Sequence, residues 1–196
     1  LATWQAGEEV FVCGILRDVT DRKRMEQRMR AEHAIAKILA EAPSAQQALP
    51  EILKTVCETL GWDLGILWLV DRRANVLQFG ESCSVSAAAS FEAMSRTKTF
   101  MPGVGLPGRV WAENAPAWIS NVQGDANFPR LASSKEAGLA GAIGFPIVSG
   151  KTMKGVMEFF SHQICPPDDE LLSMMAAIGR QIGLFLDRSQ LEEQFH

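Results

Sequence analysis

Three closely spaced glycines constrain this chain more than any other short stretch of its sequence. The segment reads GVGLPG, so Gly103, Gly105 and Gly108 match the G-x-G-x-x-G spacing of loops that hold a dinucleotide pyrophosphate at a helix N-terminus. Such a loop requires a buried strand before the glycines and, after them, a helix long enough to cross back over a parallel sheet. The flanking sequence therefore tests whether the chain binds a dinucleotide.

Neither required element is present in the flanking sequence. The preceding residues, EAMSRTKTFM, are too charged for a central strand, and Pro116 limits the following helix to residues 107–114. We therefore interpret the glycines as a sharp bend with positive φ. After the bend, Pro107 starts a single helical turn that carries Trp111 inward.

The apolar residues of the chain follow strand and helix periods in turn, without a repeating βαβ order. This mixture predicts an α+β fold with a five- or six-stranded, mostly antiparallel sheet. The predicted strands are a hairpin within 1–19, the segments 62–70, 76–82 and 116–122, and a hairpin over 141–162; the predicted helices cover 20–42, 45–61, 85–100, 133–139 and 166–195.

Charge and composition exclude several classes of partner. The formal net charge is −4 and the pI is about 5.4, so no bulk attraction to nucleic acid or to an anionic membrane surface is expected. The longest apolar run, LGILWLV, is too short to span a bilayer, so no membrane insertion is expected. The four cysteines are scattered without metal-ligand spacing, which favours reduced thiols in a cytoplasmic protein without a metal site.

Both terminal helices carry apolar stripes. In the first helix the stripe includes Met25 and Met29. In the last helix the spacing alternates between four and three residues, which is a heptad pattern. We expect this last stripe to pack on the protein's own sheet as far as Phe185, and the helix then to continue as a coiled coil with a second copy. The last stripe consists of Leu171, Met175, Ile178, Ile182 and Phe185.

The segments PGVGLPGRVWAENAPAWISNV and AGLAGAIGFPIVSGKTMKGVMEFFSH, followed by the long last helix, resemble a GAF domain over roughly residues 34–190. The resemblance implies a sheet with the N- and C-terminal helices on one face and a capping segment on the other. It also implies that any small-molecule pocket lies between the sheet and this capping segment.

Upstream, GEEVFVCGILRDVTDRKRMEQ resembles the last strands and exit linker of a PAS domain, with Asp18, Val19 and Thr20 as the motif that joins the sheet to an outgoing helix. We therefore expect both ends of the chain to continue into neighbouring domains. The implied organisation is a PAS C-terminal hairpin remnant at 1–19, a linker or signalling helix at 20–42, the GAF domain at 43–190 and the start of an outgoing helical linker at 191–196.

A PAS remnant followed by a GAF domain resembles the sensory region of a bacterial sensor histidine kinase. The resemblance implies a regulatory homodimer that relays a signal to a downstream kinase domain; the alternatives are a small-molecule sensor of a diguanylate cyclase or a transcription activator, and a GAF-type methionine sulfoxide reductase. The residues implied in the signalling or dimer helices are Asp18, Thr20, Met25, Met29, Ile178, Ile182 and Phe185.

The sequence lacks the residues that some GAF domains use to bind a chromophore or to catalyse a reaction. No cysteine lies between Cys83 and Cys165 to hold a bilin, and Leu106 stands in the glycine loop where the nucleophile of a sulfoxide reductase would be sought. The three histidines are not placed to ligate haem. We predict no catalytic residue, metal ligand or cofactor in this chain, and whether the parent protein is an enzyme stays open.

A pocket on the capped face would suit a small, mainly apolar ligand. Arg130 could meet an anionic group there, although a solvated loop arginine is the commoner alternative. The candidate pocket residues are Trp68, Trp111, Phe128, Arg130 and Met157.

Overall fold

A six-stranded antiparallel sheet forms the centre of the structure, a computed structural model that describes residues 2–6, 9–13, 20–85 and 88–194. The strand order within the described residues is β5-β4-β3-β8-β7-β6, and each neighbouring pair runs antiparallel. The predicted α+β class and antiparallel sheet are therefore confirmed. The strands are β3 (Leu64–Asp71), β4 (Val76–Ser84), β5 (Thr99–Phe100), β6 (Ala117–Ile119), β7 (Gly141–Ser149) and β8 (Thr152–Ser161).

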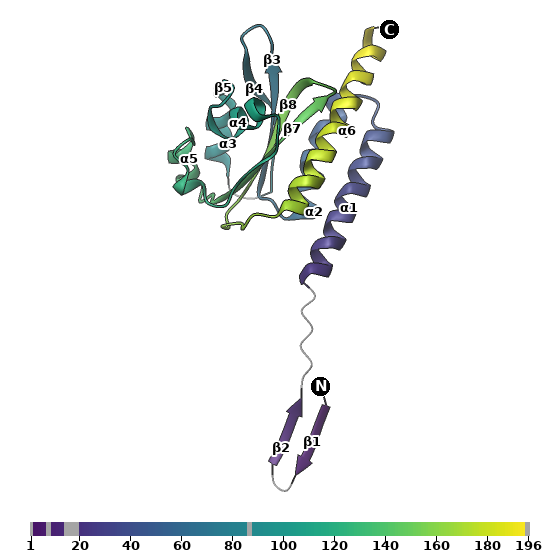
Figure 1. Ribbon diagram of the computed structural model, residues 1–196, viewed down its shortest axis with the longest axis vertical. Coiled ribbons are helices and arrows are strands. Elements are labelled where there is room, and N and C mark those ends of the chain that lie inside the picture. Colours follow the sequence, from purple (N-terminus) through teal and green to yellow (C-terminus); the bar gives the residue numbers. More distant parts are fainter. Residues whose placement is uncertain (1, 7–8, 14–19, 86–87, 195–196) are drawn as a thin grey trace.

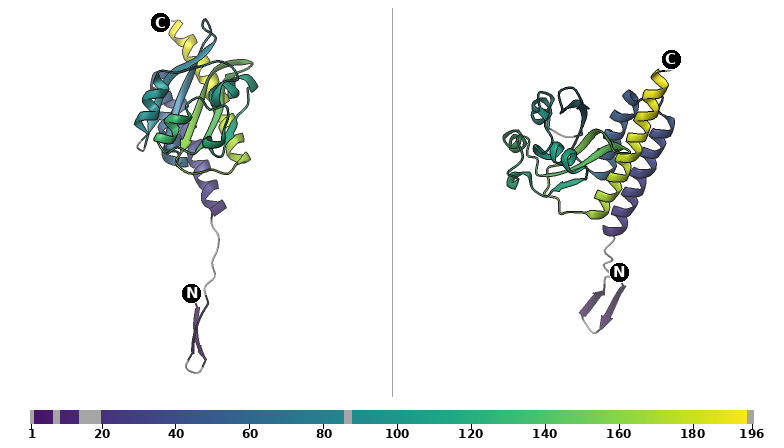
Figure 2. Two further views of the ribbon diagram at one scale, coloured as in Figure 1. Left: turned by 90° about the vertical axis from the view of Figure 1, so that its left-hand side faces the viewer. Right: turned by 45° about the horizontal axis from the view of Figure 1, so that its top comes forward.

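Helices cover both faces of this sheet (Figures 1 and 2). The long helices from the two ends of the domain gather on one face, and short helices cap the other, as expected. The long helices are α1 (Thr20–Glu41), α2 (Ala45–Leu60) and α6 (Asp169–Gln194); the capping elements are α3 (Ala89–Arg96), α4 (Gly105–Glu113), the 3-10 turn η1 (Val122–Gly124) and α5 (Leu131–Glu136).

The alternation of side chains along the central strands divides the interior into two cores. In β3, Leu67 joins the core under the long helices, whereas its neighbours Ile66 and Trp68 join the core under the cap. In β8, Phe159 faces the long helices and Phe160 faces the cap. We call these the helix-side core and the cap-side core.

Close contact between α6 and the sheet depends on two helical glycines. A Cβ atom at Gly179 would lie 2.1 Å from the carbonyl oxygen of Pro146, and one at Gly183 would lie 2.0 Å from that of Val148. Both neighbours are backbone atoms of β7, so no side-chain rotation could relieve the clash. The last helix is thus seated on the sheet along its middle, where four of its heptad residues are buried and Leu171 is partly buried.

The N-terminal segment forms the hairpin that the sequence predicts. Strand β1 (Ala2–Ala6) pairs with β2 (Glu9–Cys13) in an antiparallel two-stranded sheet, with Trp4 opposite Phe11. Asp18 lies outside the described residues, and α1 begins at Thr20. In the described part of the chain, no helix has the length and hydrophobicity required to cross a membrane.

Candidate functional site

The glycine loop forms a tight bend between β5 and α4. Gly103 has φ 84° and Gly105 has φ 65°, both in the left-handed region that glycine adopts readily. Gly108 is needed for space, because a Cβ atom there would lie 2.3 Å from the carbonyl oxygen of Met101. The predicted bend is therefore confirmed. The helix that follows differs from the prediction, because α4 begins at Gly105 and continues to Glu113 instead of forming a single turn from Pro107.

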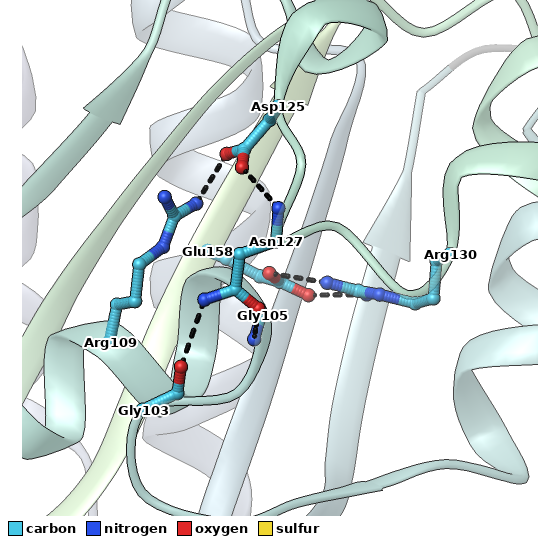
Figure 3. Close-up of polar contacts among 7 residues, drawn as sticks. All are labelled: Gly103, Gly105, Arg109, Asp125, Asn127, Arg130 and Glu158. Atoms are coloured by element: carbon cyan, nitrogen blue, oxygen red, sulfur yellow. Dashed lines mark hydrogen bonds and ion pairs between the residues drawn. The ribbon is translucent and has the colours of Figure 1, made fainter.

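The polar groups of this loop are bound within the protein. The side-chain oxygen of Asn127 accepts from the Gly105 amide at 2.9 Å, and its NH₂ group donates to the Gly103 carbonyl at 2.9 Å. Asp125 accepts from the Asn127 amide at 2.8 Å and forms an ion pair with Arg109 of α4 (Figure 3). The loop thus joins α4 to the chain between β6 and β7, and the Gly105 amide is already bonded rather than available to a phosphate.

A second polar cluster lies inside the cap-side core. Arg130, at the start of α5, forms two hydrogen bonds with Glu158 of β8, at 2.6 and 2.8 Å (Figure 3). The Glu158 carboxylate also accepts from the indole nitrogen of Trp68 at 2.8 Å, and Arg130 contacts the hydroxyl of Ser95 at 3.1 Å. Arg130 is 2% exposed and Glu158 is fully buried, so the charges neutralise one another away from water.

Five aromatic rings surround the Arg130 guanidinium. Their centroids lie between 4.9 and 5.5 Å from its central carbon, within the range of cation–π attraction. Two of the rings stand on central strands of the sheet and the other three on capping segments and the edge strand. The rings, which with Glu158 form what we call the aromatic cage, belong to Trp68, Phe91, Phe100, Phe128 and Phe160.

The structure brings together three of the five candidate pocket residues. Trp68, Phe128 and Arg130 meet in the cage, and the commoner alternative of a solvated Arg130 is wrong. Met157 points to the helix-side core, because alternation along β8 places it on the opposite face from Glu158. Trp111 is only half-buried at the margin of the cap-side core, whereas Leu106 and Val110 of the same helix are fully buried in it.

Sequence reasoning missed Glu158 and the other three rings of the cage. A glutamate between apolar residues in GVMEFFS was the available signal, since a charge in a doubly covered strand needs a buried partner. The partner itself could not be read from the sequence, because Arg130 lies 28 residues away on a segment outside the sheet.

Cys57, Cys83 and Cys165 lie on the other side of the sheet from the cage. Cys57 of α2 is buried in the helix-side core, and Cys83 and Cys165 pack against it. Burial raises the pKa of each of these three thiols above its ordinary value, so they remain protonated near neutral pH. These thiols are poorly placed and poorly ionised for nucleophilic chemistry at the cage.

The terminal helices divide into a buried and an exposed apolar face. Ile178, Ile182 and Phe185 are buried in the helix-side core of their own protomer. In contrast, Met25 is 59% exposed and Met29 is 63% exposed on α1. The dimer residues expected from α6 are therefore occupied within the chain, while those from α1 face outward.

A shallow groove of about 470 Å³ runs between α1 and α6. Leu184, 62% exposed, stands in this groove on the face of α6 that points away from the sheet. The groove is lined by Ala36, Leu39, Ala40, Gln181, Leu184, Phe185 and Arg188.

Arg28 connects the two terminal helices at the opposite end. Its guanidinium forms ion pairs with Asp168, just before α6, and with Glu170 in the first turn of α6. The Arg28 side chain is 16% exposed and that of Asp168 26%, so their bond is partly shielded from water, whereas the Glu170 side chain is 82% exposed. We call this contact the Arg28 clamp.

Comparison with known proteins identifies relatives for most of the chain. A family model described as GAF domain matches residues 42–187. The anthocyanin regulatory Lc protein of Zea mays is 33% identical over 86 residues, which are 43% of this chain and 13% of the maize protein. The chain therefore spans a small part of the length of that relative.

Solved structures resemble the whole domain. The free methionine-R-sulfoxide reductase from Neisseria meningitidis, in complex with its substrate, has a TM-score of 0.73 at 16% identity, with 91% of this chain and 98% of that chain covered. The nlh2 GAF domain of A. aeolicus, in an inactive state, has a TM-score of 0.66 at 24% identity, with coverages of 83% and 97%. At these identities the likeness concerns the fold.

Proposed function

This chain belongs to the GAF domain family, and from that premise we propose that it is a regulatory module that relays a signal between neighbouring domains through its terminal helices. The observation that carries the proposal is the outward apolar face of those helices. Met29 and Leu184 are each more than 60% exposed, although both belong to long helices seated on a well-packed domain. Large apolar side chains that a folded domain leaves exposed are the kind of group that an interface buries.

A second copy of the chain is the partner that we propose for this face. The first helix has apolar residues on its buried side and on its exposed side. Ile35 and Ile38 are buried in the helix-side core, and Met25 and Met29 are exposed. Two copies that bring these outer faces together would form a bundle of four helices whose apolar seam is shielded from water. A change in the angle or register of such a bundle is a two-state element that could carry a signal.

In the full-length protein we place this module between a PAS domain and an output domain. The support is the resemblance of residues 7–27 to the last strands and exit linker of a PAS domain. A sensor histidine kinase is the output that we favour, and a diguanylate cyclase or a transcription activator is the alternative. The Arg28 clamp supports this role, because it attaches the incoming helix to the start of the outgoing helix.

Sedimentation equilibrium tests the relay surface directly. We expect the wild-type chain to be a dimer and Leu184→Glu to weaken its association by at least ~10-fold, because a charge would then be buried in an apolar seam. Ala132→Glu, on the exposed part of α5 beyond the opposite face of the sheet, is the matched control and should leave the dimer intact. A wild-type chain that stays monomeric, or an equal response of the two variants, would contradict the proposal.

A further inference from the structure

The carboxylate at the centre of the aromatic cage and the cation that it binds belong to different parts of the fold. Glu158 and Trp68 stand on the central strands β8 and β3, which are paired with each other. Arg130 is supplied by the segment between η1 and α5, which is outside the sheet (Figure 3). The sheet therefore fixes a negative group in place, and a capping segment delivers the positive one.

The surroundings of this carboxylate suit a flat organic cation. The two oxygens of Glu158 take the two terminal nitrogens of Arg130 at 2.6 and 2.8 Å, the paired geometry that a planar guanidinium provides and an ammonium group does not. The five rings add cation–π attraction on several sides and exclude water.

Arg130 does not satisfy all of its own hydrogen-bonding groups in this position. Its Nε atom is buried and has no hydrogen-bond partner. A buried donor without a partner weakens the net binding of Arg130 in the cage, because the donor gives up a hydrogen bond to water and gains none in return. A free cation, not attached to the backbone of α5, could orient its donors independently.

We propose that the aromatic cage around Glu158 is a binding site for a small guanidinium compound, and that Arg130 occupies this site as an internal ligand in the structure described here. Binding exchanges one cation for another, so Glu158 is never left with an uncompensated buried charge. The displaced Arg130 would move its capping segment, which carries the Asn127 bonds to the glycine loop. The proposal concerns the interior of one protomer and goes beyond the relay, so it stands whether or not two copies pair.

The test removes the internal ligand and supplies a free one. Arg130→Ala leaves Glu158 and the five rings in place, and the probe is methylguanidinium chloride, with methylurea as its neutral isostere and sodium chloride at equal ionic strength. Methylammonium chloride serves as a second arm, which separates a planar cation from a compact one. The readout is the thermal midpoint of unfolding for wild type, Arg130→Ala and Arg130→Ala/Glu158→Gln as a function of probe concentration.

We expect methylguanidinium to raise the midpoint of Arg130→Ala, with methylammonium weaker and methylurea and sodium chloride inactive. The double variant should not respond, since the carboxylate charge is gone. Wild type should respond with an apparent Kd at least ~10-fold higher, because Arg130 must first leave the cage. If Arg130→Ala does not fold alone, methylguanidinium should restore the folded fraction.

Three results would overturn the proposal. The first is no methylguanidinium response of Arg130→Ala, folded or unfolded, while the double variant folds normally. The second is an equal response of the double variant, which would locate the binding elsewhere. The third is a wild-type chain that never responds at concentrations that saturate Arg130→Ala, which would make Arg130 a permanent part of the core.

Discussion

The Arg130 side chain shows how strongly one residue depends on its surroundings in this domain. A loop arginine is usually solvated, yet here two carboxylate oxygens, a hydroxyl and five rings replace the water around its guanidinium. The same carboxylate also receives the indole N–H of Trp68, so Glu158 connects the sheet and the cap through one buried network. Removing either charge alone would leave the other uncompensated, which costs more than the pair contributes.

A prediction at the residue scale concerns Cys57, whose burial raises the pKa of its thiol above the ordinary value. The folded state then keeps a proton that the unfolded state releases, so the stabilisation is fully present below the unfolded-state pKa and is lost as pH rises above it. Between about pH 9 and pH 10, we expect the free energy of unfolding of wild type to fall by up to about 1.4 kcal/mol more than that of Cys57→Ala. Urea unfolding at both pH values measures this difference, and parallel pH profiles for the two proteins would contradict it.

The positions of the cysteines lead to a prediction about sulfoxide reduction. Because Cys57, Cys83 and Cys165 pack on the helix-side core, we expect no thiol of the domain to reduce free methionine-R-sulfoxide, although the Neisseria meningitidis reductase has the same fold. Turnover that is lost in Cys83→Ala would show that sulfoxide chemistry uses a thiol away from the cage.

At the scale of elements, the glycine loop and the segment that follows β6 act as one unit. Asn127 contributes both a donor and an acceptor to the loop, and Asp125 holds α4 through Arg109. These side-chain bonds connect the two segments, which are not paired by the backbone hydrogen bonds of a sheet. The segment between β6 and β7 is therefore joined to α4 by a small number of polar contacts as well as through the cap-side core.

A prediction at this scale replaces the central amide of that unit. Asn127→Ala leaves the Gly105 amide and the Gly103 carbonyl without partners, so we expect a loss of about 1–3 kcal/mol in the free energy of unfolding. Asn121→Ala is the matched control, because Asn121 is exposed and its side chain accepts from the Gln123 amide within η1; it should cost about 1 kcal/mol or less. Equal losses in urea unfolding would show that the loop does not depend on Asn127.

At the scale of the whole molecule, the terminal helices are the parts that can connect this domain to others. The Arg28 clamp joins α1 to the start of α6, while the seam of α6 is seated on β7 through its glycines. Movement of α1 would thus be transmitted first to the N-terminal turn of α6. The confirmed GAF architecture places these helices together on one face, away from the cage.

A final prediction tests this coupling with amide hydrogen exchange. Arg28→Ala removes two charged hydrogen bonds, so we expect the first turns of α1 to exchange about 10-fold faster, with the sheet unchanged. Arg22→Ala is the control, since Arg22 pairs with Glu26 within the same helix and is largely exposed. Similar exchange in both variants would mean that the clamp does not hold α1 against α6.

The sequence by itself located the central strands and the long helices in their order, but it missed the short edge strand β5 and the turn η1. Periods of two and near 3.6 residues located the central strands and the long helices, and the glycine spacing together with its charged flanks excluded a dinucleotide loop. The resemblance to a GAF domain, read from the same segments, is confirmed. These features depend on local pattern, which a chain carries wherever it folds.

Only the tertiary structure decided which side chains meet. Glu158 and Arg130 are 28 residues apart on segments that share no pattern, so their pairing arises from packing of the cap against the sheet. The terminal helices differ in this respect. The heptad spacing by itself predicts that Ile182 packs on the sheet, but only the structure shows that Met25 and Met29, in the stripe of the first helix, are exposed. Burial is a property of neighbours in space, and neighbours distant in sequence are fixed only when the whole chain has packed.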